Sequence, residues 1–111
     1  MPRTSLTAAQ ASRAGTVLPA ATAGDAVNGN SIANDGRVIL IAKNTNGAST
    51  ARTITFQTAR SVVDDLSKPT RQESIPAGET QVFGPFPSTD YGTTLNFDVS
   101  NAEVTIQAVR V

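Results

Sequence analysis

The sequence predicts an all-β domain, an antiparallel β-sandwich with an extended N-terminal arm. Apolar and polar residues alternate in three segments, Ala51–Thr58, Thr93–Val99 and Glu103–Val111, as in strands with one buried face. Turn-forming Gly, Pro, Asn and Asp separate the strand candidates, and no convincing helical pattern is present. Six or seven strands spaced in this way fit an Ig-like sandwich or a small jelly roll, and both topologies stay open. Residues 1–24 are assigned to the arm and residues 25–111 to one sandwich domain.

The arm is rich in Ala, Thr and Ser, and its larger apolar side chains after Met1 are Leu6, Val17 and Leu18. A helix here would have almost no apolar face and would be marginal alone. Because so few apolar groups cannot offset the entropy of ordering the backbone, we expect the arm to lie on a partner surface. These three apolar residues are the expected anchors, and Arg3 and Arg13 the expected charge contacts.

The next segment, Asp25 to Gly36, is dense in Asn, Asp and Gly. Such residues favour consecutive turns, with a short strand around Asn30–Ile32. Side-chain oxygens also suit Ca²⁺, but the spacing is not that of an EF-hand and the segment has only two carboxylates. We therefore expect turns here, and no metal or cofactor.

The strand Arg37–Asn44 is the most continuous apolar run and is entered through a turn signal. Val38 and its alternate neighbours point to one side, while Ile39 and Ile41 point to the other. Both sides are apolar, so the strand is predicted to be central and covered on both faces.

Downstream, Asn46-Gly47 predicts a hairpin that joins this strand to Ala51–Thr58. The segment Ala59–Pro69 is interpreted as a loop with a few apolar anchors. Arg71–Ile75 is predicted to be a polar edge strand, and Pro85 ends the strand that begins at Thr80. The last two strands are predicted to form a hairpin.

The amino-acid composition gives little support for an enzyme. The chain has no histidine and no cysteine, which excludes Ser-His-Asp, Cys-His and His-based zinc sites. Asp64-Asp65 is the obvious carboxylate pair, but adjacent carboxylates in loops are usually solvated. We expect no enzyme.

Nucleic-acid and membrane partners are also not expected. The net charge is zero, which argues against a nucleic-acid partner. No apolar run is long enough to span a bilayer, and Met1–Ser5 has no signal-peptide character.

The role of three strand residues, Ile39, Ile41 and Phe83, can be interpreted in two ways. They can belong to a core, which is the commoner fate of apolar side chains, with Phe83 under the Ala59–Pro69 loop. Alternatively, another subunit can cover them. We keep all three as candidate interface residues, together with those of the arm.

Several turn-and-strand phrases together resemble small proteins from the virion-structure region of tailed bacteriophages. These phrases are Arg13–Thr16, Asn34–Arg37 with the apolar strand after it, Ile75–Thr80, Gly84–Pro87 and Val104–Val111. The resemblance covers most of the chain and has no catalytic signature.

The resemblance implies a non-enzymatic virion structural protein, a capsid decoration or cement protein. Its partners would be the major capsid protein or other virion proteins, and it would be a homo-oligomer on the capsid surface, made in the host bacterial cytoplasm. A neck, tail or baseplate component is one alternative. A carbohydrate- or ligand-binding β-sandwich is the other, although sugars usually stack on aromatic rings and the chain has one Tyr and no Trp.

Overall fold

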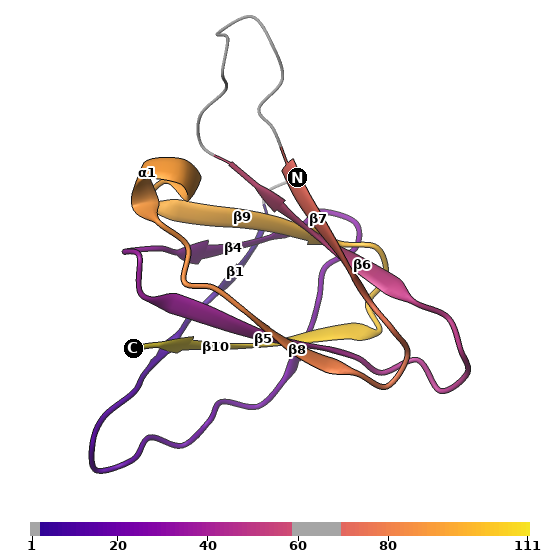
Figure 1. The fold of residues 1–111 in the computed structure, drawn as a ribbon, viewed down its shortest axis with the longest axis horizontal. Helices are drawn as coiled ribbons and strands as arrows, with labels where there is room; N and C mark the ends of the chain where they lie inside the picture. Colours follow the sequence, from indigo (N-terminus) through magenta and orange to yellow (C-terminus); the bar gives the residue numbers. More distant parts are fainter. Residues whose placement is uncertain (1–2, 59–69) are drawn as a thin grey trace, which may run out of the picture.

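The computed structural model describes residues 3–58 and 70–111, which fold into two packed five-stranded sheets (Figure 1). The expected Ala59–Pro69 loop and the Asp64-Asp65 pair lie outside the described residues. The first sheet has the order β1 (Thr4–Leu6), β4 (Asn30–Ala33), β9 (Thr94–Val99), β6 (Arg52–Gln57) and β7 (Thr70–Ile75). The second has the order β2 (Ala9–Gln10), β10 (Val104–Arg110), β5 (Val38–Asn44) and β8 (Thr80–Phe83), and β3 (Thr22–Ala23) also pairs with β10. One helical turn, α1 (Ser88–Tyr91), stands in the expected loop before β9.

The sheets are mixed rather than purely antiparallel. β1 pairs in parallel with β4, and β2 in parallel with β10, whereas every other described pair is antiparallel. A parallel pair needs a long connection, which residues 7–29 supply between β1 and β4. The antiparallel prediction is thus confirmed for the strands from β3 onward and wrong for β1 and β2.

The separate N-terminal arm is the second correction. Residues 4–6, 9–10 and 22–23 are strands of the two sheets, so they lie on surfaces of their own chain. Backbone hydrogen bonding to open sheet edges satisfies this polar segment, which the apolar count could not reveal. Within the expected arm, residues 11–21 leave the sandwich, as the loop at the lower left of Figure 1.

The antiparallel strands pair in a nested order. β6 pairs with β7, β5 with β8, β4 with β9, and β3 with β10, as in one long ribbon folded on itself. The chain changes sheet in most of its connections, including those from β4 to β5, from β5 to β6 and from β9 to β10.

Two predicted hairpins are therefore wrong. The Asn46-Gly47 turn joins strands of different sheets, and so does the turn between β9 and β10. Alternation defines which face of a strand is buried, and strands from opposite sheets bury their faces in one core equally well. It does not define which strand is the hydrogen-bonded neighbour.

Two buried asparagines hold the chain where it changes sheet around β5. Before the strand, Asn34 Nδ2 donates to the carbonyl oxygens of Phe86 and Gly92 at 3.0 and 2.9 Å. At its end, Asn44 Nδ2 donates to the carbonyl oxygens of Thr50 and Ile75 at 3.0 and 2.8 Å. Each side-chain oxygen accepts a backbone N–H two residues further on, so both side chains also shape the turns.

The core lies between the sheets and is made from their inner faces. The predicted inward residues Ile54, Phe56 and Phe97 are at most 1% exposed, which confirms the register of these strands. β5 is central, as predicted, between β10 and β8. Its inner face is fully buried, but Ile39 and Ile41 on the outer face are only half-buried, so coverage of both faces is incomplete.

Candidate functional site

The outward-facing sides of the two sheets differ sharply in chemistry. In the first sheet, residues that alternate with the core positions are mainly Ser, Thr, Asn and Gln; we call this surface the hydroxyl face. Its members on β4, β6 and β9 are Ser31, Ala33, Thr53, Thr55, Gln57, Thr94, Asn96 and Asp98. Such side chains keep their hydrogen bonds with water, so this face needs no cover.

The second sheet presents an apolar surface that we call the isoleucine face. Ile39 and Ile41 on β5 lie at its centre, with Val82 of β8 and Val109 of β10 opposite them in register. Val82 is 65% exposed. The sheet therefore carries a continuous row of incompletely covered apolar side chains across three strands.

Two exposed cations flank the isoleucine face. Arg37 precedes β5, and Lys43 lies near the end of that strand. Neither forms an ion pair within the described residues, whereas four other arginines do. The outward positions of β5, β8 and β10 carry no carboxylate. The face is thus apolar at its centre and positive at its ends.

Residues 11–21, which we call the projecting loop, carry the second group of predicted interface residues. Val17 is 89% and Leu18 48% exposed, and Arg13 is exposed without an ion-pair partner in the described chain. The base of the loop is held by hydrogen bonds: Ala11 N donates to Arg110 O, and Gln107 Nε2 donates to Pro19 O, both at 2.8 Å. The loop that carries the exposed Val17 and Leu18 is therefore fixed at its base.

The remaining predicted interface residues contact their own chain. Arg3 Nη1 pairs with Asp98 Oδ1 at 2.8 Å and also donates to two backbone carbonyls. Leu6 packs against the core, and the ring centroid of Phe83 lies 5.3 Å from that of Phe56. The structure thus gathers Ile39 with Ile41, and Val17 with Leu18 and Arg13, but not all eight residues in one place.

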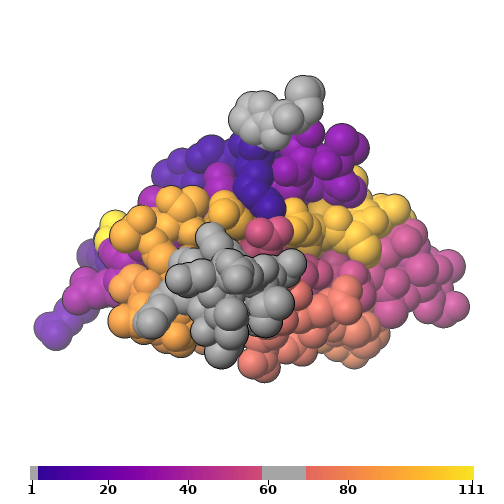
Figure 2. All heavy atoms as spheres, turned by 90° about the horizontal axis from the view of Figure 1, so that it is seen from above, coloured from indigo at the N-terminus to yellow at the C-terminus, as the bar shows by residue number. Residues whose placement is uncertain are grey.

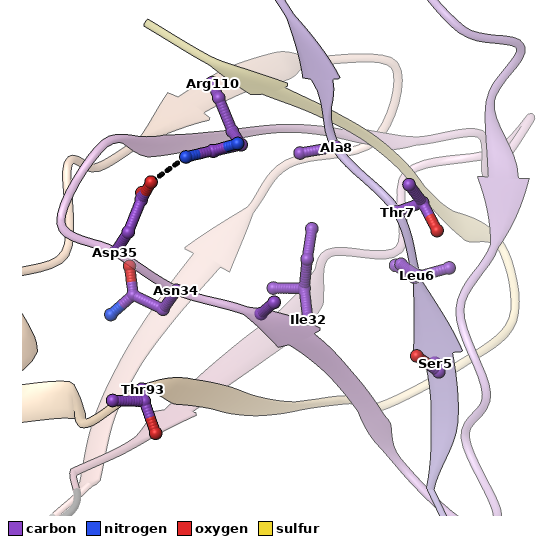
Figure 3. Close-up of a pocket in the computed structure, with 10 residues that line it drawn as sticks. Ser5, Leu6, Thr7, Ala8, Ile32, Asn34, Asp35, Thr93 and Arg110 are labelled. Atoms are coloured by element: carbon purple, nitrogen blue, oxygen red, sulfur yellow. Dashed lines mark hydrogen bonds and ion pairs between the residues drawn. The ribbon is translucent and has the colours of Figure 1, made fainter.

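A pocket of about 480 Å³ lies where the N-terminal segment passes from the first sheet to the second (Figure 3). Leu6, Ala8 and Ile32 supply its apolar wall, and an ion pair between Asp35 and Arg110 lies at one side. Its remaining polar groups are mainly hydroxyls, and Asn34 is already committed to the backbone. The carboxylate that lines this pocket, Asp35, is paired with Arg110.

A second cleft, of about 500 Å³, lies beside β7, β8 and α1; we call it the aromatic cleft. Four of the five aromatic residues in the sequence line it, namely Phe56, Phe83, Phe86 and Tyr91. Phe86 lies at the centre of this group, 5.0 Å from Phe56 and 5.2 Å from Tyr91 between ring centroids. Pro85 predicted a strand end here, but nothing in the local sequence indicated that aromatic residues from distant segments would gather.

The Asp25–Gly36 oxygens make turns, as predicted. Asp25 Oδ1 accepts the backbone N–H groups of Val27 and Asn28, and its Oδ2 accepts the Thr4 hydroxyl. These hydrogen bonds, that from Asn28 first, lower the pKa of Asp25 below its ordinary 3.8. In the described ranges, no three acidic side chains gather as a metal site would need.

Glu103 is the other carboxylate with a clear shift. A hydrogen bond from the Asn46 side chain, and then those from Arg52, lower the pKa of Glu103 below its ordinary 4.5. This network ties the turn before β10 to the chain that leaves β5. Its role is therefore structural.

Comparisons with known proteins identify no relative of this chain. The sequence matches no protein family, and neither the curated proteins nor the solved structures contain a significant match. Across residues 3–58 and 70–111, no helix has the length and apolar character required to cross a membrane.

Proposed function

We propose that this chain is a virion structural protein of a tailed bacteriophage, a decoration or cement protein that binds the lattice of the major capsid protein. The sequence resemblance motivates the proposal. The observation that carries it is the contrast between the two outer faces: one sheet is mainly polar, and the other has the half-buried Ile39 and Ile41 beside the exposed Val82. A protein that lies on a particle needs one face for the particle and one for water.

The charges of the isoleucine face favour a partner other than the same face of a second copy. Face-to-face packing would bring Arg37 and Lys43 of two copies toward each other without a compensating acid. Like charges at an interface disfavour the pairing. A capsid surface with an apolar centre and acidic margins would be complementary to this face.

The strand order supports the same class of protein. We infer that the nested pairing from β6–β7 out to β3–β10 is a jelly roll rather than an Ig-like sandwich, with β1 and β2 added at the edges. Jelly rolls are common in viral capsid proteins and in lectins. Since a fold alone does not define a function, the argument depends on the isoleucine face.

The test is co-sedimentation with capsids that lack this protein. Ile41→Asp places a carboxylate in the middle of the isoleucine face, and we expect at least a tenfold loss of affinity, about 1.4 kcal/mol. The matched control is Ser31→Asp, at a half-buried position of the hydroxyl face between Ser5 and Asn96. Circular dichroism should show that both variants fold.

Each result has a defined meaning. Equal binding by the two variants would show that the isoleucine face is not the contact. If the unaltered protein does not bind capsids, the decoration proposal fails. Hundreds of copies per particle fit the capsid surface, while a dozen or fewer indicate the neck, tail or baseplate. Binding on a glycan array would instead favour the ligand-binding alternative.

A further inference from the structure

We propose that Asn46 is a site of spontaneous modification: in the folded protein, the backbone nitrogen of Gly47 attacks the Asn46 side-chain amide and converts the residue to aspartate or isoaspartate. The reaction involves neither the isoleucine face nor a partner protein. It can therefore be tested on the free protein, and its failure would leave the capsid proposal intact.

The dipeptide Asn-Gly occurs twice in the sequence, at Asn28-Gly29 and at Asn46-Gly47. Because glycine has no Cβ, its backbone nitrogen can approach the side-chain carbonyl carbon of the preceding asparagine. The N–Cγ bond forms, the side-chain nitrogen leaves as ammonia with the proton of the glycine N–H, and a succinimide ring remains. Water then opens the ring at either carbonyl and gives aspartate or isoaspartate. The sequence alone ranks the two dipeptides equally, whereas the structure separates them.

The Asn46-Gly47 dipeptide presents an activated electrophile and an accessible nucleophile. Asn46 Oδ1 accepts the backbone N–H groups of Ala48 at 2.8 Å and Thr50 at 3.4 Å. Negative charge develops on this oxygen during the attack, so N–H dipoles aimed at it stabilise the transition state. Gly47 is exposed, and its N–H makes no hydrogen bond within residues 3–58 and 70–111, so hydroxide from solvent can remove the proton. The backbone nitrogen of Gly47 is therefore free to react.

Asn28-Gly29 serves as an internal control because its nitrogen is already engaged. Gly29 is buried, and its N–H donates to Asp25 O at 3.0 Å. Its Cα packs closely against the ion pair of Arg3 and Asp98, where even an added Cβ would collide. Attack on the Asn28 side chain would break this hydrogen bond and displace the ion pair. Folding should therefore shield Asn28.

The reactive turn lies between β5 and β6, at the right of Figure 1 and of Figure 2, beside the residues that lead into β10. Asn46 Nδ2 donates to Glu103 Oε1 at 2.9 Å, and the Asn46 backbone N–H donates to Asn44 Oδ1 at 3.0 Å. An aspartate carboxylate at position 46 cannot donate, and it would face the carboxylate of Glu103. Isoaspartate would also lengthen the main chain next to Asn44. Modified copies should therefore be less stable than unmodified ones.

Peptide mapping of the folded, unaltered protein tests the assignment. The protein is incubated at mildly alkaline pH, and mass spectrometry follows the conversion of amide to acid in the tryptic peptides 44–52 and 14–37. We expect Asn46 to react in the folded protein while Asn28 stays intact, and both to react at similar rates in urea. If Asn28 reacts as fast as Asn46 in the folded protein, or if neither reacts although both do in urea, the proposal is overturned.

Gly47→Ala tests the nucleophile without changing the fold. A Cβ at position 47 meets no atom within 4 Å, so the melting temperature should not change. The added methyl group hinders the approach of the nitrogen, and we expect the reaction at Asn46 to slow by about tenfold, equivalent to roughly 1.4 kcal/mol of activation free energy. An unchanged rate would show that Gly47 is not the nucleophile.

The variant Asn46→Asp tests the consequence for stability. It should lower the melting temperature by about 4 °C, as expected when one hydrogen bond to a charged group is lost. The matched background is Glu103→Gln, in which the side chain opposite position 46 is uncharged, so the same change should cost less. An equal loss in both backgrounds would show that the new carboxylate does not meet Glu103.

Discussion

Replacing Asn44 by Ala should destabilise the protein far more than its surface-like residue type suggests. The Asn44 side chain is completely buried and makes three hydrogen bonds to backbone groups, at 2.8 to 3.0 Å. With about 1 kcal/mol net for each bond, the variant should lose about 3 kcal/mol of unfolding free energy. This is a large share of the roughly 5–15 kcal/mol of a typical domain. The melting temperature should fall by about 12 °C, at roughly 4 °C per kcal/mol.

The matched control is Asn96→Ala on the hydroxyl face. Asn96 lies in the middle of β9, is half-buried, and has Ser31 and Gln57 beside it in register. Its replacement should change the unfolding free energy by less than about 0.5 kcal/mol. Urea titration of both variants gives the two values. Similar losses at the two positions would refute the argument that Asn44 holds the passage from β5 to β6.

Three further predictions concern the core, the carboxylates and a glycine. Phe97→Ala, at a fully buried position, should cost ~3–5 kcal/mol in urea titration. Asp25 and Glu103 have lowered pKa values, so their stabilisation is complete above 3.8 and 4.5 and is lost as pH falls through the lower folded-state values. As pH is lowered, the melting temperature of the double variant Asp25→Asn, Glu103→Gln should therefore fall less steeply than that of the unaltered protein. Gly29→Ala should cost ~2 kcal/mol, since φ is +80° and a Cβ would meet the Arg3–Asp98 pair; Gly47→Ala, in open space, should be neutral.

The sequence predicted well what depends on side-chain alternation. The burial of Ile54, Phe56 and Phe97 follows from the alternation of apolar and polar residues. The central position of β5 follows from its apolar residues on both faces, and the edge position of β7 from its polar composition. The turns around Asp25 were predictable because Asx side chains bond to backbone two or three residues away, and such bonds are local.

The sequence alone could not predict the contacts between residues that lie far apart in the chain. Asn34 and Asn44 bond to residues 31 to 58 positions away, and Arg3 pairs with Asp98 across 95 positions. The same is true of the aromatic cleft, which strands far apart in the chain assemble. The isoleucine face was partly predictable, because alternation placed Ile39 and Ile41 on one side of the strand but did not indicate that they would be only half-buried.

The nested strand order has a consequence for synthesis on the ribosome. The central strand β5 lies between β8 and β10, and β10 also holds β2 and β3. Until Val104–Arg110 has left the exit tunnel, β5 has one open edge and the N-terminal strands of the second sheet have no neighbour. After the short parallel pair β1–β4, the first pairs available are β6–β7 and then β5–β8, so the antiparallel strands should assemble outward from the middle of the chain. Pairing between such distant segments is slow, and the apolar β5 edge would stay open to chaperones, and to other nascent copies, throughout that interval.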